Sequence, residues 1–235
     1  GSFKNMKICI CIPSRGRYNY VNRLLTSAFK TVKNSQNIIV KYYINEDDKQ
    51  LEQYKMQLER FKNQYPDSVD YIIGPDQSPV YSWNLIAENT EADLYMLAGD
   101  ESIFKTKHWD ELLFKYAEKY KDGICVLAPY DERGPHSYNT CTTPIVTKQW
   151  AQALGYYWNP ALWHWYIDGY TEKLVKAIDR FVYVKDVVVS TKKVHDKTGR
   201  RTRTSGLLNR DKWVYKKLMQ NNFEDDIKKL KSKIL

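Results

Sequence analysis

The first hundred residues alternate between short apolar runs and segments whose apolar residues recur at helical spacing. The apolar runs are each of strand length and cover residues 7–12, 37–44, 69–73 and 94–104. Between them, apolar side chains return every three or four residues over 21–32, 51–61 and 80–87, which places them on one face of a helix. Ser78 followed by Pro79 is typical of a helix start. Three strand–helix repeats followed by a fourth strand predict a parallel sheet with crossover helices.

The pattern is less regular after residue 104. It predicts helices over 109–120 and 148–154, strands over 124–129, 144–146 and 181–190, and a loop over 131–143. The segment 192–210 is basic, contains Gly199 and Gly206, and is expected to be a mobile loop. The tail from Asp211 is expected to be helical, with an apolar stripe. No linker or repeat interrupts the chain, so a single domain over 3–235 is expected, leaving out Gly1 and Ser2 as residues typical of cloning.

The amino-acid composition indicates the general kind of binding partner but does not identify it. The 235 residues are 43% apolar and 28% charged, as in an ordinary globular protein with a large core. A formal net charge of +9 favours an anionic partner, which could be nucleic acid, a membrane surface or a phosphate-bearing substrate. The 19 Tyr and 7 Trp residues are compatible with a cleft for ring-shaped ligands and equally with core packing.

The four cysteines do not form the pattern of a disulfide scaffold or a zinc site. Cys9 and Cys11 are two apart on a predicted strand, so they share a face, point in parallel and are poorly placed to bridge. No CxxC pair, no membrane-length apolar run and no signal peptide is visible in the sequence. The reducing cytoplasm is therefore the expected location.

The segment 94–104, LYMLAGDESIF, carries the first candidate chemistry. Its apolar run is broken by Gly99 and followed by Asp100 and Glu101. Adjacent carboxylates at the carboxyl end of a buried strand are well placed to hold a metal in an open α/β sheet. An ordinary Gly-Asp turn explains the same residues.

Five segments in order carry a resemblance to a known family. They are ICIPSRGR (10–17), INEDD (44–48), the helix–strand unit over 78–104, LWHWYIDGY (162–170) and KVHDKTGR (193–200). In this order the chain resembles nucleotide-sugar glycosyltransferases of the GT-A fold, especially the family 2-like group, from about residue 7 to 204. The resemblance implies an α/β, Rossmann-like fold with a mixed, mainly parallel central sheet flanked by helices. It also implies a nucleotide-sugar half (3–104), an acceptor half (105–210) and a C-terminal helix (211–235).

The activity implied by the resemblance is transfer of a sugar from an NDP-sugar, with UDP-sugar favoured, to an acceptor hydroxyl. A divalent metal, Mn²⁺ or Mg²⁺, would clamp the diphosphate of the donor. Asp100 matches the last acid of the DxD pattern of the family, whereas Ala98 stands at the position of the first acid. Glu101 is then expected to contribute, and His195 to complete the coordination, unless His195 is a solvated loop residue.

Asp168 matches the acid that resembling inverting enzymes use as general base, and a helix cap or turn before Gly169 is the alternative. The flanking aromatic residues form either a ring-stacking wall for the acceptor or part of the core; they are Trp163, His164, Trp165 and Tyr166.

The nucleotide is expected at the ends of the first two strands and on the helix that leads to Asp100. The residues assigned to it are Pro13, Ser14, Arg15, Arg17, Glu46, Asp47, Tyr81 and Asn84. Arg200 and Arg201, together with Arg203, are expected to close over the diphosphate or to contact an anionic acceptor. For each arginine the alternative is a solvated surface charge.

The acceptor is predicted from charge and aromatic content. Basic charge, an arginine-rich loop and an aromatic cluster favour a hydroxymethylated base in DNA, as in phage DNA modification. A glycan, lipid or protein acceptor is the alternative. Two other classes compete: nucleotidyl transfer, against which the glycine-poor turn PSRGR argues, and non-catalytic nucleic-acid binding, whose zinc-finger and RNP signals the sequence lacks.

Overall fold

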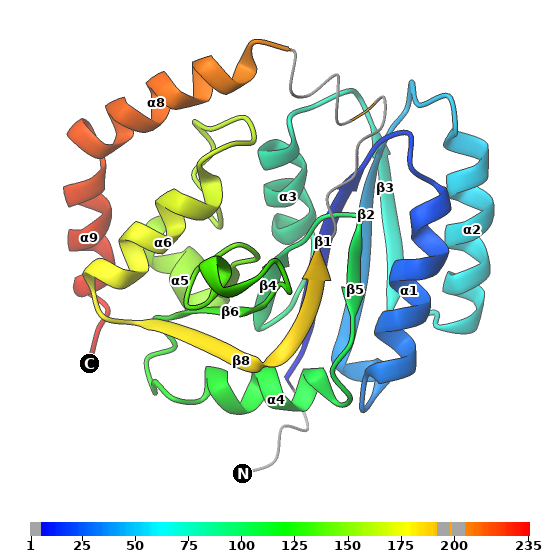
Figure 1. Ribbon diagram of the computed structural model, residues 1–235, viewed down its shortest axis with the longest axis horizontal. Helices are drawn as coiled ribbons and strands as arrows, with labels where there is room; N and C mark the ends of the chain where they lie inside the picture. The colour runs from blue at the N-terminus through cyan, green and yellow to red at the C-terminus, as the bar shows by residue number, and fades with distance from the viewer. Residues whose placement is uncertain (1–5, 192–197, 199–204) are drawn as a thin grey trace.

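The computed structural model describes residues 6–191, 198 and 205–235, and its centre is an eight-stranded sheet flanked by helices (Figure 1). The strands follow the order β3-β2-β1-β4-β7-β6-β8-β5. Their bounds are β1 Ile8–Ser14, β2 Ile38–Asn45, β3 Val69–Gly74, β4 Leu94–Leu97, β5 Ser102–Phe104, β6 Val126–Tyr130, β7 Ile145–Thr147 and β8 Phe181–Thr191. The fold is therefore the mixed α/β architecture expected from the sequence.

The N-terminal half confirms the predicted strand–helix repeats. Strands β3, β2, β1 and β4 are all parallel, with Ile8 of β1 opposite Ile38 on one side and Leu94 on the other. The connecting helices are α1 (Asn19–Thr31), α2 (Leu51–Gln64) and α3 (Pro79–Glu88). Successive side chains of β1 enter two separate cores, because a strand alternates its faces and both faces are covered. The near-continuous apolar run of β1 follows from this double burial.

The second half makes the sheet mixed. Strand β7 pairs antiparallel with both β4 and β6, β6 and β8 are parallel, and β5 pairs antiparallel with β8. The helices of this half are α4 (Trp109–Ala117), α5 (Lys148–Leu154) and α6 (Ile167–Ala177), with a short 3₁₀ turn at Pro135–Ser137. Another 3₁₀ turn, Ser35–Asn37, precedes β2 in the first half. Helix α6 was not predicted, and it begins inside the aromatic segment 159–170.

The segment 94–104 is not one strand, as the sequence pattern suggested. Strand β4 ends at Leu97, and the chain then crosses to β5 at the far edge of the sheet, where Ser102 lies opposite Thr191. Gly99 lies in this crossing, and its lack of a side chain leaves room for the carboxylate of Glu101. The two acids therefore lie on an irregular connection beyond the carboxyl ends of β1 and β4.

The C-terminal tail contains two helices instead of one, α8 (Leu207–Asn221) and α9 (Phe223–Lys231). Helix α9 packs against α5 and α6, and its buried Asp226 accepts hydrogen bonds from the hydroxyls of Tyr156 and Tyr170. All four cysteine thiols are buried and free. Among the described residues, every helix is too short or too polar to cross a membrane.

Candidate active site

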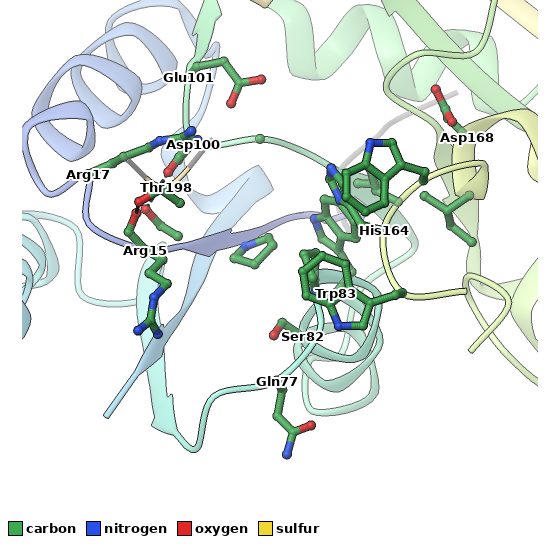
Figure 2. A pocket seen from close by; sticks show the side chains of 18 of the residues that line it. Arg15, Arg17, Gln77, Ser82, Trp83, Asp100, Glu101, His164, Asp168 and Thr198 are labelled. Atoms are coloured by element: carbon green, nitrogen blue, oxygen red, sulfur yellow. Dashed lines mark hydrogen bonds and ion pairs between the residues drawn. The ribbon is translucent and has the colours of Figure 1, made fainter. Parts of the chain in front are cut away.

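A cavity of about 590 Å³ lies beyond the carboxyl ends of β1 and β4, within the size range of small-molecule sites. Its walls come from the β1–α1 turn, the β4–β5 crossing, helix α3 and the segment before α6. Figure 2 shows Arg17 and Asp100 on one side of this cavity and Asp168 on the other, with Trp83 and His164 between them. Segments more than 150 residues apart in sequence thus contribute to one site.

The β1–α1 turn forms one wall and contains the first group of predicted residues. Pro13, Ser14, Arg15 and Arg17 all line the cavity. The turn is possible because Gly16 adopts a left-handed conformation (φ +65°). The backbone N–H of Gly16 donates to the carboxylate of Asp48 at 2.8 Å, which fixes the turn against the end of β2.

Asp100 is held against this turn by two contacts. The hydroxyl of Ser14 donates to one carboxylate oxygen of Asp100 at 2.7 Å, and the guanidinium of Arg17 lies 3.0 Å from the other. Asp100 is only 4% exposed, so this ion pair is shielded from water. Arg17 therefore balances the charge of Asp100 at the cavity wall.

Glu101 is the second carboxylate of the crossing and also lines the cavity. Burial, followed by the nearby charge of Asp100, raises the pKa of Glu101 to about 7. Two crowded acidic side chains offer the oxygen ligands that Mn²⁺ and Mg²⁺ prefer, and a bound cation would relieve their mutual repulsion. Asp100 and Glu101 are therefore the residues that would hold a divalent metal here, with Asp100 also in contact with Ser14 and Arg17.

The remaining predicted metal ligand is His195. His195 lies outside the described residues, and within the described ranges no cluster of three or more His, Cys, Asp or Glu side chains forms a metal site. Ala98 is fully buried in the core, and its carbonyl accepts a hydrogen bond from the indole of Trp83 at 3.0 Å. The position of the missing first acid is thus a packing position.

The opposite wall contains the four aromatic residues predicted for the acceptor: Trp163, His164, Trp165 and Tyr166 all line the cavity. Asp211 of α8 positions their backbone, because its fully buried carboxylate accepts from the N–H groups of residues 163, 164 and 165 at 2.8, 2.8 and 2.9 Å. Sequence reasoning missed this residue, since nothing in the local pattern of the tail points to a contact nearly fifty residues away.

His164 is a neutral part of this wall. Burial lowers the pKa of His164 to about 4, so the imidazole is uncharged at neutral pH. Its ring is stacked on the indole of Trp83, with 5.9 Å between ring centroids. The residue therefore adds an uncharged ring to the wall, stacked on Trp83 and edge-on to Trp163 and Trp165.

Asp168 lies in the first turn of α6 and faces the cavity. One carboxylate oxygen accepts from the backbone N–H of Gly169 at 2.9 Å, so the turn contact considered from the sequence exists together with the cavity position. Burial raises the pKa of Asp168, which makes its carboxylate more basic than that of an exposed aspartate. Asp168 therefore presents a carboxylate of raised pKa to the cavity.

The predicted base and ribose contacts differ from the observed lining. Glu46 and Asp47 are exposed and do not line the cavity, and Asp47 pairs with Arg15 at 2.9 Å. The chain turns outward after β2, so the last strand residue, Asn45, lines the cavity instead. Asp76 and Gln77, which follow β3, lie beside it and were not foreseen.

Helix α3 presents a different face from the one expected. Tyr81 is 47% exposed and lies outside the lining. The amide of Asn84 is used internally, because it donates to the carbonyl of Trp158 at 2.7 Å and accepts from the N–H of the same residue at 3.1 Å. Ser82 and Trp83 face the cavity instead, since one helical position corresponds to a rotation of about 100°.

The segment 131–143 and its neighbours add residues that the sequence did not single out. Arg133, Thr142 and Thr143 line the cavity, and Nε of Arg133 donates to the hydroxyl of Thr191 at 2.7 Å. Their only sequence signal was a polar loop. Arg200, Arg201 and Arg203 lie outside the described residues. Thr198 is described, and its hydroxyl donates to the carbonyl of Arg15 at 2.8 Å.

Comparison with known proteins establishes the fold. No family model matches the sequence, and a search of curated proteins gives no significant match. Among solved structures, the chain is similar to the mannosyltransferase PcManGT from Pyrobaculum calidifontis in complex with GDP-Man and Mn²⁺, with a TM-score of 0.65 and 9% identity over 97% of this chain and 73% of that one. It is also similar to S. aureus TarS 1-349 in complex with UDP-GlcNAc (TM-score 0.63, 15% identity, 81% of this chain and 60% of that one).

A third similar structure is GalNAc-T7 with UDP, GalNAc and Mn²⁺, with a TM-score of 0.63 and 9% identity over 81% of this chain and 44% of that one. The chain thus spans less than two thirds of the TarS and GalNAc-T7 chains. These likenesses, at low identity, show that the chain has the GT-A fold.

Proposed function

We propose that this protein transfers a sugar from an NDP-sugar to an acceptor hydroxyl. One observation carries the proposal: a single cavity has the Arg17–Asp100 pair on one wall and Asp168 on the facing wall. Such a site can hold a diphosphate at one end and deprotonate a hydroxyl at the other. The similar structures, which are complexes with nucleotide sugars or nucleotides, support this proposal.

The donor binds along the β1–α1 turn in this proposal. Arg15 and Arg17 provide guanidinium groups for phosphate oxygens. Asn45, Asp76 and Gln77 line the cavity beside that turn and are assigned to the base and ribose. UDP-sugars are the first donors to test. The donor half is assigned to residues 3–104 and the acceptor half to 105–210, with 211–235 as the C-terminal part.

A divalent metal, Mn²⁺ or Mg²⁺, would be held by Asp100 and Glu101, with His195 as a further proposed ligand outside the described residues. When bound, it stabilises the negative charge that develops on the departing diphosphate. Arg17 adds positive charge at the same wall. In the chemical step the carboxylate of Asp168 takes the proton of the acceptor hydroxyl, whose oxygen bonds to the anomeric carbon as the carbon–oxygen bond to the diphosphate breaks.

The aromatic wall receives the acceptor. Trp163 and Trp165 are stacked with 5.9 Å between ring centroids and cover one side of the cavity, where they exclude water that would hydrolyse the donor. We propose a hydroxymethylated base in DNA as the acceptor, ahead of a glycan, lipid or protein. The net charge of +9 and the cationic Arg133 in the cavity wall support an anionic acceptor, and the cytoplasm is the proposed location.

The test is incubation of the protein with a panel of NDP-sugars, with and without Mn²⁺, followed by assay of free NDP. DNA that contains hydroxymethylated pyrimidines, and matched unmodified DNA, are included as acceptors and examined by mass spectrometry. A sugar-sized mass increase on the modified DNA alone is the expected result. Release of NDP without a change in DNA mass would keep the transferase and reject the DNA acceptor. Salt-sensitive DNA binding with no turnover of any donor would indicate a nucleic-acid-binding protein instead.

A further inference from the structure

Helix α8 has an outward face of one charge sign with an aromatic side chain in it. Four residues define this face, Lys212, Trp213, Lys216 and Lys217, and all four are exposed. Trp213 is 61% exposed, which is unusual for a tryptophan. The amino group of Lys217 lies 5.6 Å from the centroid of its ring. The only acid in the helix, Asp211, is fully buried on the other side, so no carboxylate of α8 offsets the three lysines.

The inward side of α8 is already occupied. Leu218 is buried, and Val214, Tyr215 and Met219 pack against the second core. A helix that enters a membrane surface must present its apolar face to the lipid, and in α8 that face is committed to the protein. The exposed face instead presents positive charges spaced along a helix with a flat ring between them. These features suit a different kind of partner.

The position of α8 connects this face to the cavity. Leu207, the first residue of the helix, lines the cavity, and Asp211 in the next turn holds the backbone of residues 163–165. From that rim, α8 runs along the outer edge of the molecule (Figure 1). A polymer with one unit in the cavity can therefore follow the helix outward.

We infer that the Lys212/Trp213/Lys216/Lys217 face of α8 is a docking surface for a single strand of nucleic acid. The lysines contact phosphates and release their counterions, and a base stacks on the indole of Trp213. The inference rests on the proposed function only in assigning the bound strand as the acceptor; the binding itself does not require catalysis.

The experiment measures fluorescence anisotropy of a fluorescein-labelled single-stranded oligonucleotide and of its duplex at several salt concentrations. The variant K212Q/K216Q/K217Q should bind the single strand more weakly, with the slope of log K against log[salt] reduced by about 2, since each phosphate contact on a single strand contributes roughly 0.7. W213A should weaken binding about tenfold, as expected for loss of one stacked base, and W213F should restore most of the affinity.

The matched control is K107Q/K115Q/K121Q, which removes the same charge from exposed lysines in and around α4, at the opposite side of the molecule from α8 (Figure 1). It should retain the affinity of the parent to within about twofold if the site is local. An equal loss in both triple variants would overturn the inference in favour of a general effect of net charge. Equal binding of the parent and the α8 variants would also overturn it, as would α8-dependent binding to vesicles of phosphatidylserine but not to the oligonucleotide.

NDP release, measured on the same samples, separates the two proposals. Loss of strand binding in the α8 variants, with no NDP released from any donor by the parent, would keep the docking surface and reject the transferase. Unchanged strand binding in those variants, with normal NDP release and sugar transfer to DNA, would keep the transferase and reject the docking surface.

Discussion

Asp168 and Glu101 are both half-buried acids of the cavity, but their surroundings differ. Asp168 stands at the start of α6, where the helix dipole favours its charged form while burial disfavours it. Glu101 lies next to Asp100, whose charge adds to the cost of ionising it. The surroundings of Asp168 suit a carboxylate that accepts a proton. Those of Glu101 suit a carboxylate that binds a cation together with Asp100.

Replacing Asp168 with Asn tests the base. The amide keeps the size of the side chain but cannot accept the acceptor proton, so turnover should fall by about 10² to 10⁴. UDP affinity, measured by calorimetry, should stay within about twofold, because Asp168 lies on the wall that faces Arg17. Because the pKa of Asp168 is raised, the parent should also lose turnover as the pH falls through that pKa. Near-normal turnover of the variant would remove Asp168 from the mechanism.

Replacing Glu101 with Gln tests the crowding of the two carboxylates. The folded protein binds a proton at Glu101 up to about pH 7, whereas an ordinary glutamate has a pKa of 4.5, so this residue reduces stability as the pH rises through that window. The variant should therefore be as stable as the parent at pH 4 and more stable by on the order of 2 kcal/mol at pH 8. Denaturant unfolding in the presence of EDTA measures this difference.

The control for Glu101 is Glu118→Gln, an exposed position at the end of α4, which should show no such dependence on pH. A stability difference between E101Q and the parent that is the same at pH 4 and pH 8 would contradict the raised pKa.

At the scale of elements, α8 and the segment before α6 form one unit through Asp211. Replacing Asp211 with Ala leaves three backbone N–H groups without their acceptor, which should lower the free energy of unfolding by about 3 kcal/mol. Asp67→Ala, at an exposed turn, should change it by less than about 0.5 kcal/mol. Urea denaturation of both variants is the measurement, and equal stabilities would mean that the 163–165 backbone is held by other contacts.

The sequence was a good guide to elements whose apolar pattern is local. The strands and helices up to residue 89 were predictable because burial on both sides of a parallel sheet produces continuous apolar runs and amphipathic helices. The split of 94–104 was not predictable, because the pairing of Ser102 with Thr191 depends on a strand nearly ninety residues later. The second C-terminal helix was missed because the apolar stripe continues across Asn222.

The sequence predicted site residues correctly at the β1–α1 turn, at the β4–β5 crossing and at the start of α6, but not after β2. The residues of the β1–α1 turn, Asp100 and Asp168 all line the cavity. The sequence could not show that Asp47 turns outward or that the amide of Asn84 hydrogen-bonds the backbone of Trp158. Both outcomes depend on which way a side chain points after the chain leaves a regular element, and local patterns contain no information about that.

For the whole molecule, the donor should act as a link between the β1–α1 turn and the β4–β5 crossing. UDP at one hundred times its Kd should raise the free energy of unfolding by about 2.7 kcal/mol, with a further increase when Mn²⁺ is present. In Asp100→Asn the part that depends on Mn²⁺ should disappear while some stabilisation by UDP alone remains through Arg15 and Arg17. Thermal unfolding with and without each ligand measures both parts, and a Mn²⁺ effect that survives the substitution would exclude Asp100 as a ligand.

The burial of Ala98 has a consequence for protein engineering. Introducing Asp at this position would restore the DxD spelling, but the new carboxylate would start from a fully buried position in the apolar core. An unpaired charge there is costly enough to unfold a marginally stable domain or to remain protonated. Replacing Ala98 with Asp alone should therefore not create a metal site. A tighter metal site is better sought by redesigning the β4–β5 crossing around Glu101 than by copying the DxD pattern.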